Sequence, residues 1–528
     1  MPLSAQRKTA AAVRFRDDTI LYGDDALATQ IRNPPLTFVH LRQMLGWGSA
    51  PASRDARSRG GAAWFEQEGM PWYSWLEAEG RGTLRVTSCC PHLCVSAEEL
   101  NAILLAHLSD RVAATLAEER GAGMARHITD VRTVVAVPPW WGPCERAALR
   151  DAAMIGGVGG GSPADMELVD SHAALAFKFL YEWSLREGAE PTNAAGAAAD
   201  AGAAAAAKNL TALLIDVGST AVTASVVTLH RGFQSVVHRA SVEAVAWEPT
   251  IGGSSFDELL ANILRERYAS QLSAAAAAGG GGGSGGNSGS EGLSSEVEEL
   301  LSGARASATL LREGKRVKEV LSASAVAYIT LEGLPMLPPQ PPPGAAAAAS
   351  AGEGAAAVMM EGVLRTNITR VEFEQACAAL VARAVAPVGE ALRRWARLQQ
   401  QQRPPEATAP TAAARGGGDG MQVLQSVQLV GGGSRVPAVQ EGIRRVLQSP
   451  WDQRRPALPL QQQQAQQRLA LGAELNADEA MAHGAAMLAV AKHSPLALPD
   501  GRILQAPTVA SGAVRALSLF LFHLPGFV

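Results

Sequence analysis

Three consecutive glycines near the C-terminus form the turn in this sequence that is best suited to approach a ligand. Gly431, Gly432 and Gly433 follow the apolar run at 429–430 and precede Pro437, where a helix is expected to begin. Glycine has no Cβ, so its backbone can come close to a bound molecule. The unpaired N–H groups at a helix N-terminus can bind a phosphate or a ribose. The pattern therefore predicts a strand, a turn and a helix, in which the turn either binds a ligand or only connects the two elements.

A second turn carries an acidic residue. Asp216 ends the apolar run at 212–216 and is followed by Gly218, Ser219 and Thr220. The carboxylate could hold Mg²⁺ through water or cap the turn, and we favour the metal role. Gly218, Ser219 and Thr220 would approach a phosphate. The sequence has no Gly-x-x-x-x-Gly-Lys-Ser/Thr motif, which argues against a conventional P-loop enzyme.

The elements that must position these turns alternate between strands and helices, and this predicts an α/β fold. The short apolar runs at 134–137 and 212–216 predict buried central strands, and 222–229 predicts a further strand. Helices with an apolar stripe are expected at 145–155, 373–392 and 439–447.

Five tracts of low complexity interrupt these elements. They consist mostly of alanine, glycine, proline or glutamine, and such sequences cannot bury enough apolar surface to offset the entropy of ordering. We therefore expect unstructured insertions at residues 194–207, 273–292, 335–357, 399–419 and 456–467.

Composition limits the classes of partner. A net charge of −4 argues against a nucleic-acid-binding protein, which normally carries a basic patch. No apolar run reaches the roughly twenty residues that span a bilayer, and no secretory signal is visible at Met1, so no membrane partner is expected. The short apolar run at 516–522 is broken by a histidine and a proline soon after it.

Two short motifs have a conditional meaning. Cys89, Cys90, His92 and Cys94 lack the second cysteine pair of a zinc knuckle, so we expect ordinary thiols there. Asn209 and Asn367 each begin an Asn-x-Thr triplet, which is a glycosylation acceptor if the protein is lumenal.

The motifs together resemble the nucleotide-binding domain of the heat shock protein 70 family. The Gly431 turn and the block at 475–486 match the adenosine-binding end of that domain in order, spacing and residue type. Further blocks follow in family order from about residue 7 to residue 491. They are a Val-Pro strand with an Arg-bearing helix at 133–155, the second phosphate hairpin at 213–228, Gly252-Gly253 with Phe256-Asp257, the adenine-clamping helix at 310–322, and Ile368 to Phe373.

Several segments are most similar to the large endoplasmic-reticulum branch of the family, with the cytosolic large relatives as the alternative. These segments are 7–9, 22–24, 366–374, 436–441 and 476–479. The resemblance implies an actin-like ATPase fold with two lobes around a nucleotide cleft. It places the first lobe at 7–193 and the second lobe with its closing helices at 208–491, and leaves 492–528 unassigned.

The resemblance also implies site residues for ATP or ADP with Mg²⁺. It makes Asp216 the carboxylate that holds Mg²⁺ through water, and Asp170 falls near the catalytic carboxylate. Lys318 and Ser322 match the residues that clamp adenine, although Lys318 could instead lie on a solvated helix face. Arg435 matches the arginine that stacks on adenine from the other side. Asp478 matches the aspartate near the ribose, or it caps a helix.

Three departures from the family pattern predict weak ATP binding and poor hydrolysis. Leu27 stands where hydrolysing members have a catalytic lysine, and Gly218 is the one secure glycine of the second phosphate loop. The first phosphate loop, expected before Arg7, is absent. The chain thus resembles a nucleotide-binding domain with both ends missing, as in a truncated gene model.

Three functions are compatible with these residues. The first is an ATP-binding chaperone of the large lumenal type, with unfolded polypeptide clients only if a C-terminal domain exists. The second is a catalytically degenerate exchange or co-chaperone module whose partner is a conventional family member, and Leu27 favours it. The third, a sugar or acetate kinase of the same superfold, leaves the helix bearing Lys318 unexplained. The resemblance implies the endoplasmic-reticulum lumen, with the cytoplasm as the alternative.

Overall fold

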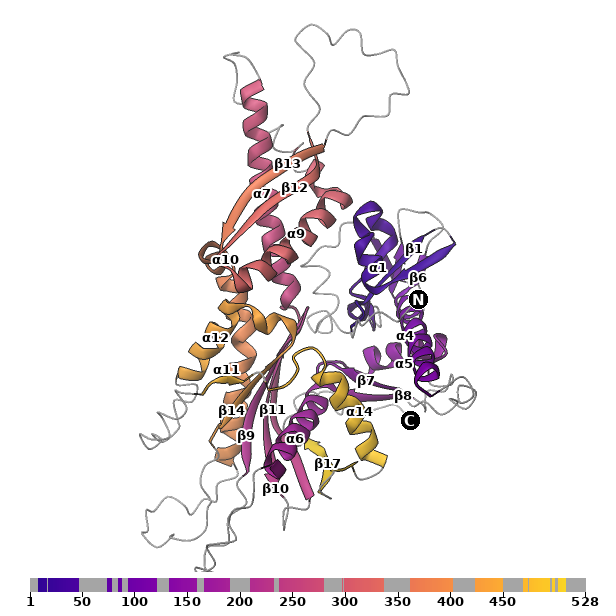
Figure 1. Cartoon of the computed structure of the whole chain (residues 1–528), viewed down its shortest axis with the longest axis vertical. Helices are drawn as coiled ribbons and strands as arrows, with labels where there is room; N and C mark the ends of the chain where they lie inside the picture. Colours follow the sequence, from indigo (N-terminus) through magenta and orange to yellow (C-terminus); the bar gives the residue numbers. More distant parts are fainter. Residues whose placement is uncertain are drawn as a thin grey trace, which may run out of the picture. The chain divides into compact units, whose positions relative to one another are not determined.

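Figure 1 shows the computed structural model of the chain. Its residues form two compact units. One unit combines residues 1–125 with 254–378, and the other combines 126–253 with 379–528. The described residues are 8–16, 18–46, 74–77, 84–87, 94–120, 133–158, 166–189, 209–231, 237–279, 297, 299–336, 361–401, 423–449, 469–472, 474–493, 496–498 and 502–509.

The first unit contains three small antiparallel sheets and a group of helices. The sheets are β2-β1-β3, β4-β5-β6 and the hairpin β12-β13. Its strands are β1 (Ala12–Arg16), β2 (Thr19–Tyr22), β3 (Thr37–Val39), β4 (Ser74–Glu77), β5 (Leu84–Thr87), β6 (Cys94–Ser96), β12 (Val326–Pro335) and β13 (Glu361–Thr369). Its helices are α1 (Gly23–Ala28), α4 (Ala97–Arg120), α7 (Gly253–Gly279), α9 (Ala304–Ala323) and α10 (Arg370–Ala376), with 3-10 turns at Gln30–Arg32, Pro34–Leu36 and Leu41–Met44.

The second unit is organised around a seven-stranded mixed sheet in the order β15-β14-β9-β10-β11-β17-β16, and β7 and β8 form a separate parallel pair. Its strands are β7 (Thr133–Val137), β8 (Met166–Asp170), β9 (Leu210–Val217), β10 (Val222–Arg231), β11 (Val237–Glu248), β14 (Ser426–Val430), β15 (Leu471–Gly472), β16 (Leu496–Ala497) and β17 (Ile503–Val509). Its helices are α5 (Pro143–Ile155), α6 (Ser171–Ala189), α11 (Ala378–Gln401), α12 (Pro437–Gln448) and α14 (Ala480–His493), with a 3-10 turn at Gly432–Arg435.

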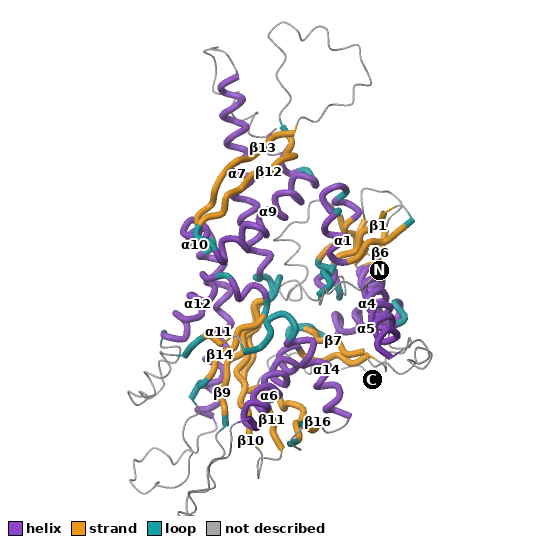
Figure 2. The backbone as a smooth tube through the Cα atoms, in the orientation of Figure 1, coloured by secondary structure: helices purple, strands orange, loops and turns teal. Residues whose placement is uncertain are grey.

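The core of the second unit lies between its sheet and the helices α6 and α14 (Figure 2). Phe177 and Phe179 of α6 are buried there together with Leu214 of β9. Ile215, on the opposite face of the same strand, is also fully buried. Because both faces of β9 are covered, its sequence reads as a continuous apolar run rather than as an alternating one.

The α/β class is confirmed, and the prediction of buried central strands is confirmed for one of two runs. Residues 212–216 belong to β9, which β14 and β10 flank on its two sides. Residues 134–137 were expected to form a buried central strand, and this was wrong. They lie in β7, which is mostly half-buried and, within the part of the chain that the structure describes, pairs only with β8. Apolar composition shows that a run is a strand, but the number of neighbouring strands depends on segments far away in sequence.

The single helix predicted at 373–392 is two helices in the structure. α10 ends at Ala376 and α11 begins at Ala378, and the two are bent by 66°. No proline or glycine marks this bend. Among the described helices none is by itself long and apolar enough to cross a membrane, and the bent pair α10–α11 passes that test only by length and composition.

Three of the five tracts predicted to be unstructured begin inside a helix or strand, so the prediction was wrong for their first residues. Residues 273–279 continue α7, residues 399–401 end α11, and Pro335 ends β12. Alanine is the best helix former, and extending an existing helix needs no new nucleation. The rest of these tracts, apart from Met336, lies outside the described residues, as does 516–522. The unassigned segment 492–528 contributes β16 and β17, and β17 pairs in parallel with β11.

The contact between α6 and α14 generates a test of the second unit's packing. Gly484 lies in α14, and a Cβ built on it would be 1.9 Å from the Ala174 carbonyl oxygen of α6. Glycine to alanine inside a helix is normally favourable by about 1 kcal/mol. For Gly484→Ala we expect the opposite sign, a loss of roughly 1–3 kcal/mol from overpacking. Thermal unfolding and amide exchange of α6 and α14 measure it. Ala486→Gly, at an exposed position of the same helix, is the control and costs about 1 kcal/mol. A higher unfolding midpoint for Gly484→Ala would contradict the packing.

Candidate functional site

The two predicted glycine turns lie against each other in the second unit. β9 and β14 are parallel neighbours with Asp216 opposite Val430, so both chains leave the sheet at the same edge. Gly431 has φ +79°, and a Cβ on it would lie 2.3 Å from the Val217 carbonyl oxygen and 2.5 Å from Asp216 Oδ1. No residue with a side chain fits this position. The turn is therefore held at van der Waals distance from the end of β9.

A third glycine segment, Gly252-Gly253, packs against the turn at 218–219. We call the surface formed by residues 216–219, 252–253 and 431–433 the glycine wall. The Gly253 N–H donates to the Gly218 carbonyl oxygen at 2.9 Å. A Cβ on Gly252 would lie 2.4 Å from the Ser219 carbonyl oxygen. The sequence showed Gly252-Gly253 only as the start of a helix. The Gly-Gly pair was also the signal for its packing on the turn at 218–219, because two adjacent glycines before a helix permit such a close approach.

The wall has a backbone surface rather than a side-chain surface, and part of it faces solvent. Gly432 and Ser219 are exposed, and nothing lies within 4 Å of a Cβ built on Gly432. The N–H groups of Gly218 and Gly431 already donate within the protein, to the Ala221 and Ala477 carbonyl oxygens at 2.9 Å each. These two glycines therefore permit close approach but do not offer those N–H groups to a ligand. The wall therefore offers fewer backbone donors to an anion such as a phosphate than the glycine count implied.

The carboxylate of Asp216 lies in this wall, next to Gly431, and is half-buried. Within the described part of the chain no three His, Cys, Asp or Glu side chains gather as metal ligands. Mg²⁺ keeps several waters and binds proteins through one or two carboxylates, so a single well-placed carboxylate is a chemically adequate donor set. The Mg²⁺ role of Asp216 stays a prediction. Cys89, Cys90 and His92 lie outside the described residues.

The residues predicted to contact adenosine from one side are brought together. Arg435 Nη2 lies 2.8 Å from Asp478 Oδ2, which joins the motifs at 431–437 and 475–486. The Arg435 side chain remains 61% exposed, so the planar face of its guanidinium stays accessible for stacking. Asn476 accepts the N–H of Asp478 at 3.1 Å through its side-chain oxygen. Asn476 thereby closes the turn that precedes α14, and the capping alternative for Asp478 stays a prediction.

Lys318 and Ser322 lie on α9 in the first unit. Lys318 Nζ is 2.6 Å from Asp257 Oδ1, and each of these side chains is only 13% exposed. The Ser322 hydroxyl donates to the Lys318 carbonyl oxygen at 2.9 Å. Burial raises the pKa of Asp257, and the neighbouring Lys318 opposes this shift. The solvated-face alternative for Lys318 is wrong, because its charge is balanced by a buried carboxylate. Adenine clamping by either residue stays a prediction.

Asp170 has a partner that the sequence analysis did not assign. Its carboxylate forms an ion pair with the guanidinium of Arg146 from α5. His172, two residues later, is buried, and neither of its ring nitrogens has a hydrogen-bond partner among the described residues. Burial lowers the pKa of His172, so this imidazole is neutral near pH 7. A catalytic role for Asp170 stays a prediction.

Comparison with known proteins supplies an independent result. The chain is 24% identical over 494 residues to hypoxia up-regulated protein 1 of Xenopus tropicalis, a match that covers 92% of this chain and 56% of that protein. It is 25% identical over 499 residues to the mouse protein of that name and 24% identical over 497 residues to the human one. The resemblance to the heat shock protein 70 family is confirmed. It falls in the large endoplasmic-reticulum branch that the motifs indicated.

The extent of these matches limits what they transfer. The chain spans about half the length of the Xenopus relative, and the matches to the mouse and human proteins cover 36% of each. No protein-family profile matches the chain. The activity, clients and partners of a whole heat shock protein 70 relative are therefore not transferred by similarity alone.

The close approach at Gly431 generates the first test of the site. For Gly431→Ala we expect a loss of roughly 2 kcal/mol or more, because an L-residue is strained at φ +79° and its Cβ overlaps the end of β9. Gly432→Ala is the matched control, and it should change stability by less than about 0.5 kcal/mol. Chemical denaturation of the two variants measures the difference. Equal stabilities would show that the turn is not packed as described.

The Lys318–Asp257 pair generates a second test. Removing one partner of a buried pair leaves an uncompensated charge, so Lys318→Met should cost about 3 kcal/mol at neutral pH. The loss should shrink in the Lys318→Met, Asp257→Asn double variant, because no buried carboxylate remains.

The pH dependence of the single variant follows from the raised pKa of Asp257. Its folded state holds the proton to higher pH than the unfolded state does, so stability falls as pH rises from about 4 through the folded-state pKa. Lys318→Met should therefore be less impaired at pH 5 than at pH 8 in thermal unfolding. A variant with unchanged stability but abolished adenosine binding would show that the lysine serves the ligand alone.

Proposed function

We propose that this chain is a nucleotide-binding domain of the actin-like ATPase type, with two lobes around a cleft, from a lumenal stress-response chaperone of the heat shock protein 70 family. In this proposal it binds ATP or ADP with Mg²⁺ and assists protein folding. The contact that carries the proposal is the Gly431 turn packed on the end of β9 beside Asp216. The similarity to hypoxia up-regulated proteins over 92% of the chain supports both the class and the lumenal location.

Each candidate site residue of the second unit has a defined role in this proposal. The glycine wall admits the phosphates, and Asp216 orients waters on the metal side of the site. Mg²⁺ supplies charge neutralisation of the phosphates when bound. Arg435, held by Asp478, offers its guanidinium face to the adenine. In the first unit, the Ser322 hydroxyl donates to the Lys318 carbonyl oxygen, and in this proposal its oxygen accepts a hydrogen bond from the base.

A second candidate, a catalytically degenerate exchange or co-chaperone module, is favoured by a specific observation. Leu27 lies in α1 and is half-buried. A hydrocarbon side chain cannot orient the attacking water or offset γ-phosphate charge. In this form the chain binds a conventional family member and opens it for nucleotide exchange.

Calorimetry with adenosine, ADP and ATP in Mg²⁺ tests nucleotide binding. We expect the three to bind within tenfold of one another, because few backbone donors are available to the phosphates. Arg435→Ala should weaken adenosine binding about tenfold, a loss of a stacking interaction worth ~1.4 kcal/mol. Arg445→Ala, an exposed arginine of α12, is the control and should bind normally.

Two outcomes separate the candidates. ATP binding at least tenfold tighter than adenosine binding, with ATP turnover that Asp216→Asn abolishes, would overturn the prediction that the phosphates are bound weakly. It would establish an active ATPase. No nucleotide binding at all would remove the first candidate. The second candidate then stands or falls on whether the chain accelerates ADP release from a conventional heat shock protein 70.

A further inference from the structure

We propose that Asn367 carries an N-linked glycan on the outer face of the β12–β13 hairpin. Asn367, Ile368 and Thr369 form an Asn-x-Thr acceptor with no proline at the central position. The proposal rests on the proposed lumenal location, because the modification is made there. It assigns a new site that is independent of nucleotide binding.

The hairpin exposes Asn367 through strict alternation. In β13 the side chains of Leu364 and Ile368 are buried, whereas Asn367 is exposed. In the antiparallel register Asn367 stands directly opposite Tyr328 of β12, so the two side chains share one face of the hairpin. Tyr328 is 78% exposed, the largest value among the exposed large apolar side chains of the described residues. This face therefore has room for a bulky group and has an aromatic ring beside the attachment point.

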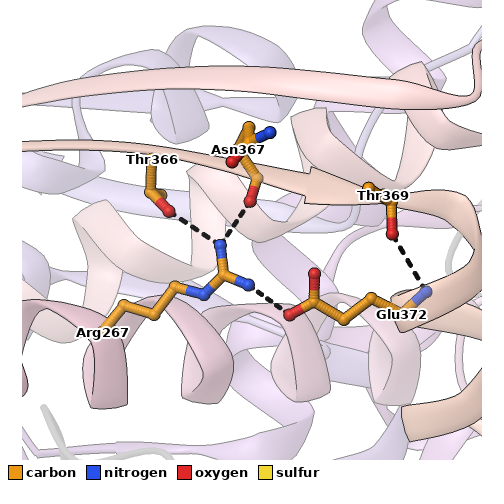
Figure 3. A network of polar contacts seen from close by, with 5 residues as sticks. All are labelled: Arg267, Thr366, Asn367, Thr369 and Glu372. Carbon is orange, nitrogen blue, oxygen red and sulfur yellow. Dashed lines mark hydrogen bonds and ion pairs between the residues drawn. The ribbon is translucent and has the colours of Figure 1, made fainter.

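The backbone beneath this face is fixed from the other side (Figure 3). Arg267 of α7 donates to Thr366 Oγ1 at 2.7 Å and to the Asn367 carbonyl oxygen, and it forms an ion pair with Glu372. Figure 3 shows the side-chain amide of Asn367 pointing away from Arg267. Among the described residues that amide has no hydrogen-bond partner. The Arg267 contacts thus use only the main chain of Asn367 and leave its acceptor nitrogen to the solvent side.

Thr369 shows when the modification must occur. Its hydroxyl, which the acceptor motif requires, accepts the Glu372 N–H at 3.2 Å as the N-cap of α10. That hydroxyl is engaged once α10 has formed, so transfer precedes the folding of this segment. The amide nitrogen of Asn367 forms a bond to the anomeric carbon of an oligosaccharide linked to a lipid diphosphate. The anomeric C–O bond breaks, the amide loses one proton, and the lipid diphosphate leaves.

Tyr328 gives the attached sugar a place to pack. The apolar face of a pyranose can lie on an aromatic ring, and an exposed tyrosine supplies such a ring without a loss of its hydroxyl hydration. The first sugar on Asn367 covers Tyr328 and shields an otherwise exposed ring. The glycan therefore stabilises the hairpin through Tyr328 rather than through contacts with the core.

The test uses the full chain directed into the endoplasmic reticulum of eukaryotic cells and purified from the lumenal fraction. An amidase that releases N-glycans, applied in ¹⁸O water, converts a glycosylated asparagine to labelled aspartate, which peptide mass spectrometry locates. We expect the label at Asn367. Asn367→Gln should remove one glycan, in the presence or absence of Asn209→Gln. Thr369→Ser keeps both the acceptor and the cap and should retain the glycan, whereas Thr369→Ala should lose it.

A second measurement tests the packing on Tyr328. Glycosylated chain should unfold at a higher temperature than the same chain after deglycosylation, and Tyr328→Ala should abolish that difference. Unmodified Asn367 in chain purified from the lumen would overturn the site, and an undiminished difference in Tyr328→Ala would overturn the stacking. Adenosine binding of the same preparations is measured separately. Loss of adenosine binding with the label present at Asn367 would count against the proposed function alone.

Discussion

The close contact between the turn after β14 and the end of β9 is the constraint on which the second unit depends. A Cβ at Gly431 would overlap both the Val217 carbonyl oxygen and the Asp216 carboxylate, so this contact exists only because the residue is glycine. The parallel register of β14 with β9, with Val430 opposite Asp216, places the turn level with the end of β9. The Gly431 N–H donates to the Ala477 carbonyl oxygen. This bond holds the segment that carries Asp478 beside the turn that leads to Arg435. One backbone approach therefore couples the candidate phosphate and adenosine residues.

The same close packing limits the chemistry. Backbone N–H groups that hold the turns together are no longer donors for a ligand, and Gly218 and Gly431 use theirs in this way. A glycine-rich turn is therefore not equivalent to a set of anion donors. Together with Leu27, this is the observation behind the proposal that the domain recognises adenosine more than it stabilises phosphoryl transfer.

Two ion pairs in the first unit, Lys318–Asp257 and Arg267–Glu372, differ in burial and therefore in what they contribute to stability. Lys318 and Asp257 are both largely buried, so the desolvation penalty of each is offset mainly by the other. The Arg267–Glu372 pair is more exposed and contributes less through charge. Its additional hydrogen bonds to Thr366 and Asn367 tie α7 to β13. That tie presents the opposite face of the hairpin, with Asn367 and Tyr328, to solvent.

The sequence by itself determined the class, the family resemblance and most of the local elements. Continuous apolar runs and glycine turns identify β9 and β14, and helical periodicity identifies α5 and α12, because these signals are local. Only the tertiary structure decided which elements meet. It paired β7 with β8 at the side of the main sheet's described strands rather than among them, divided the helix at 373–392, placed β17 beside β11, and joined Lys318 to Asp257. Pairing and burial depend on residues far apart in the chain, and single-sequence patterns carry no record of those partners. The Asn367 triplet shows both levels, because the motif is local whereas its exposure beside Tyr328 is a property of the folded hairpin.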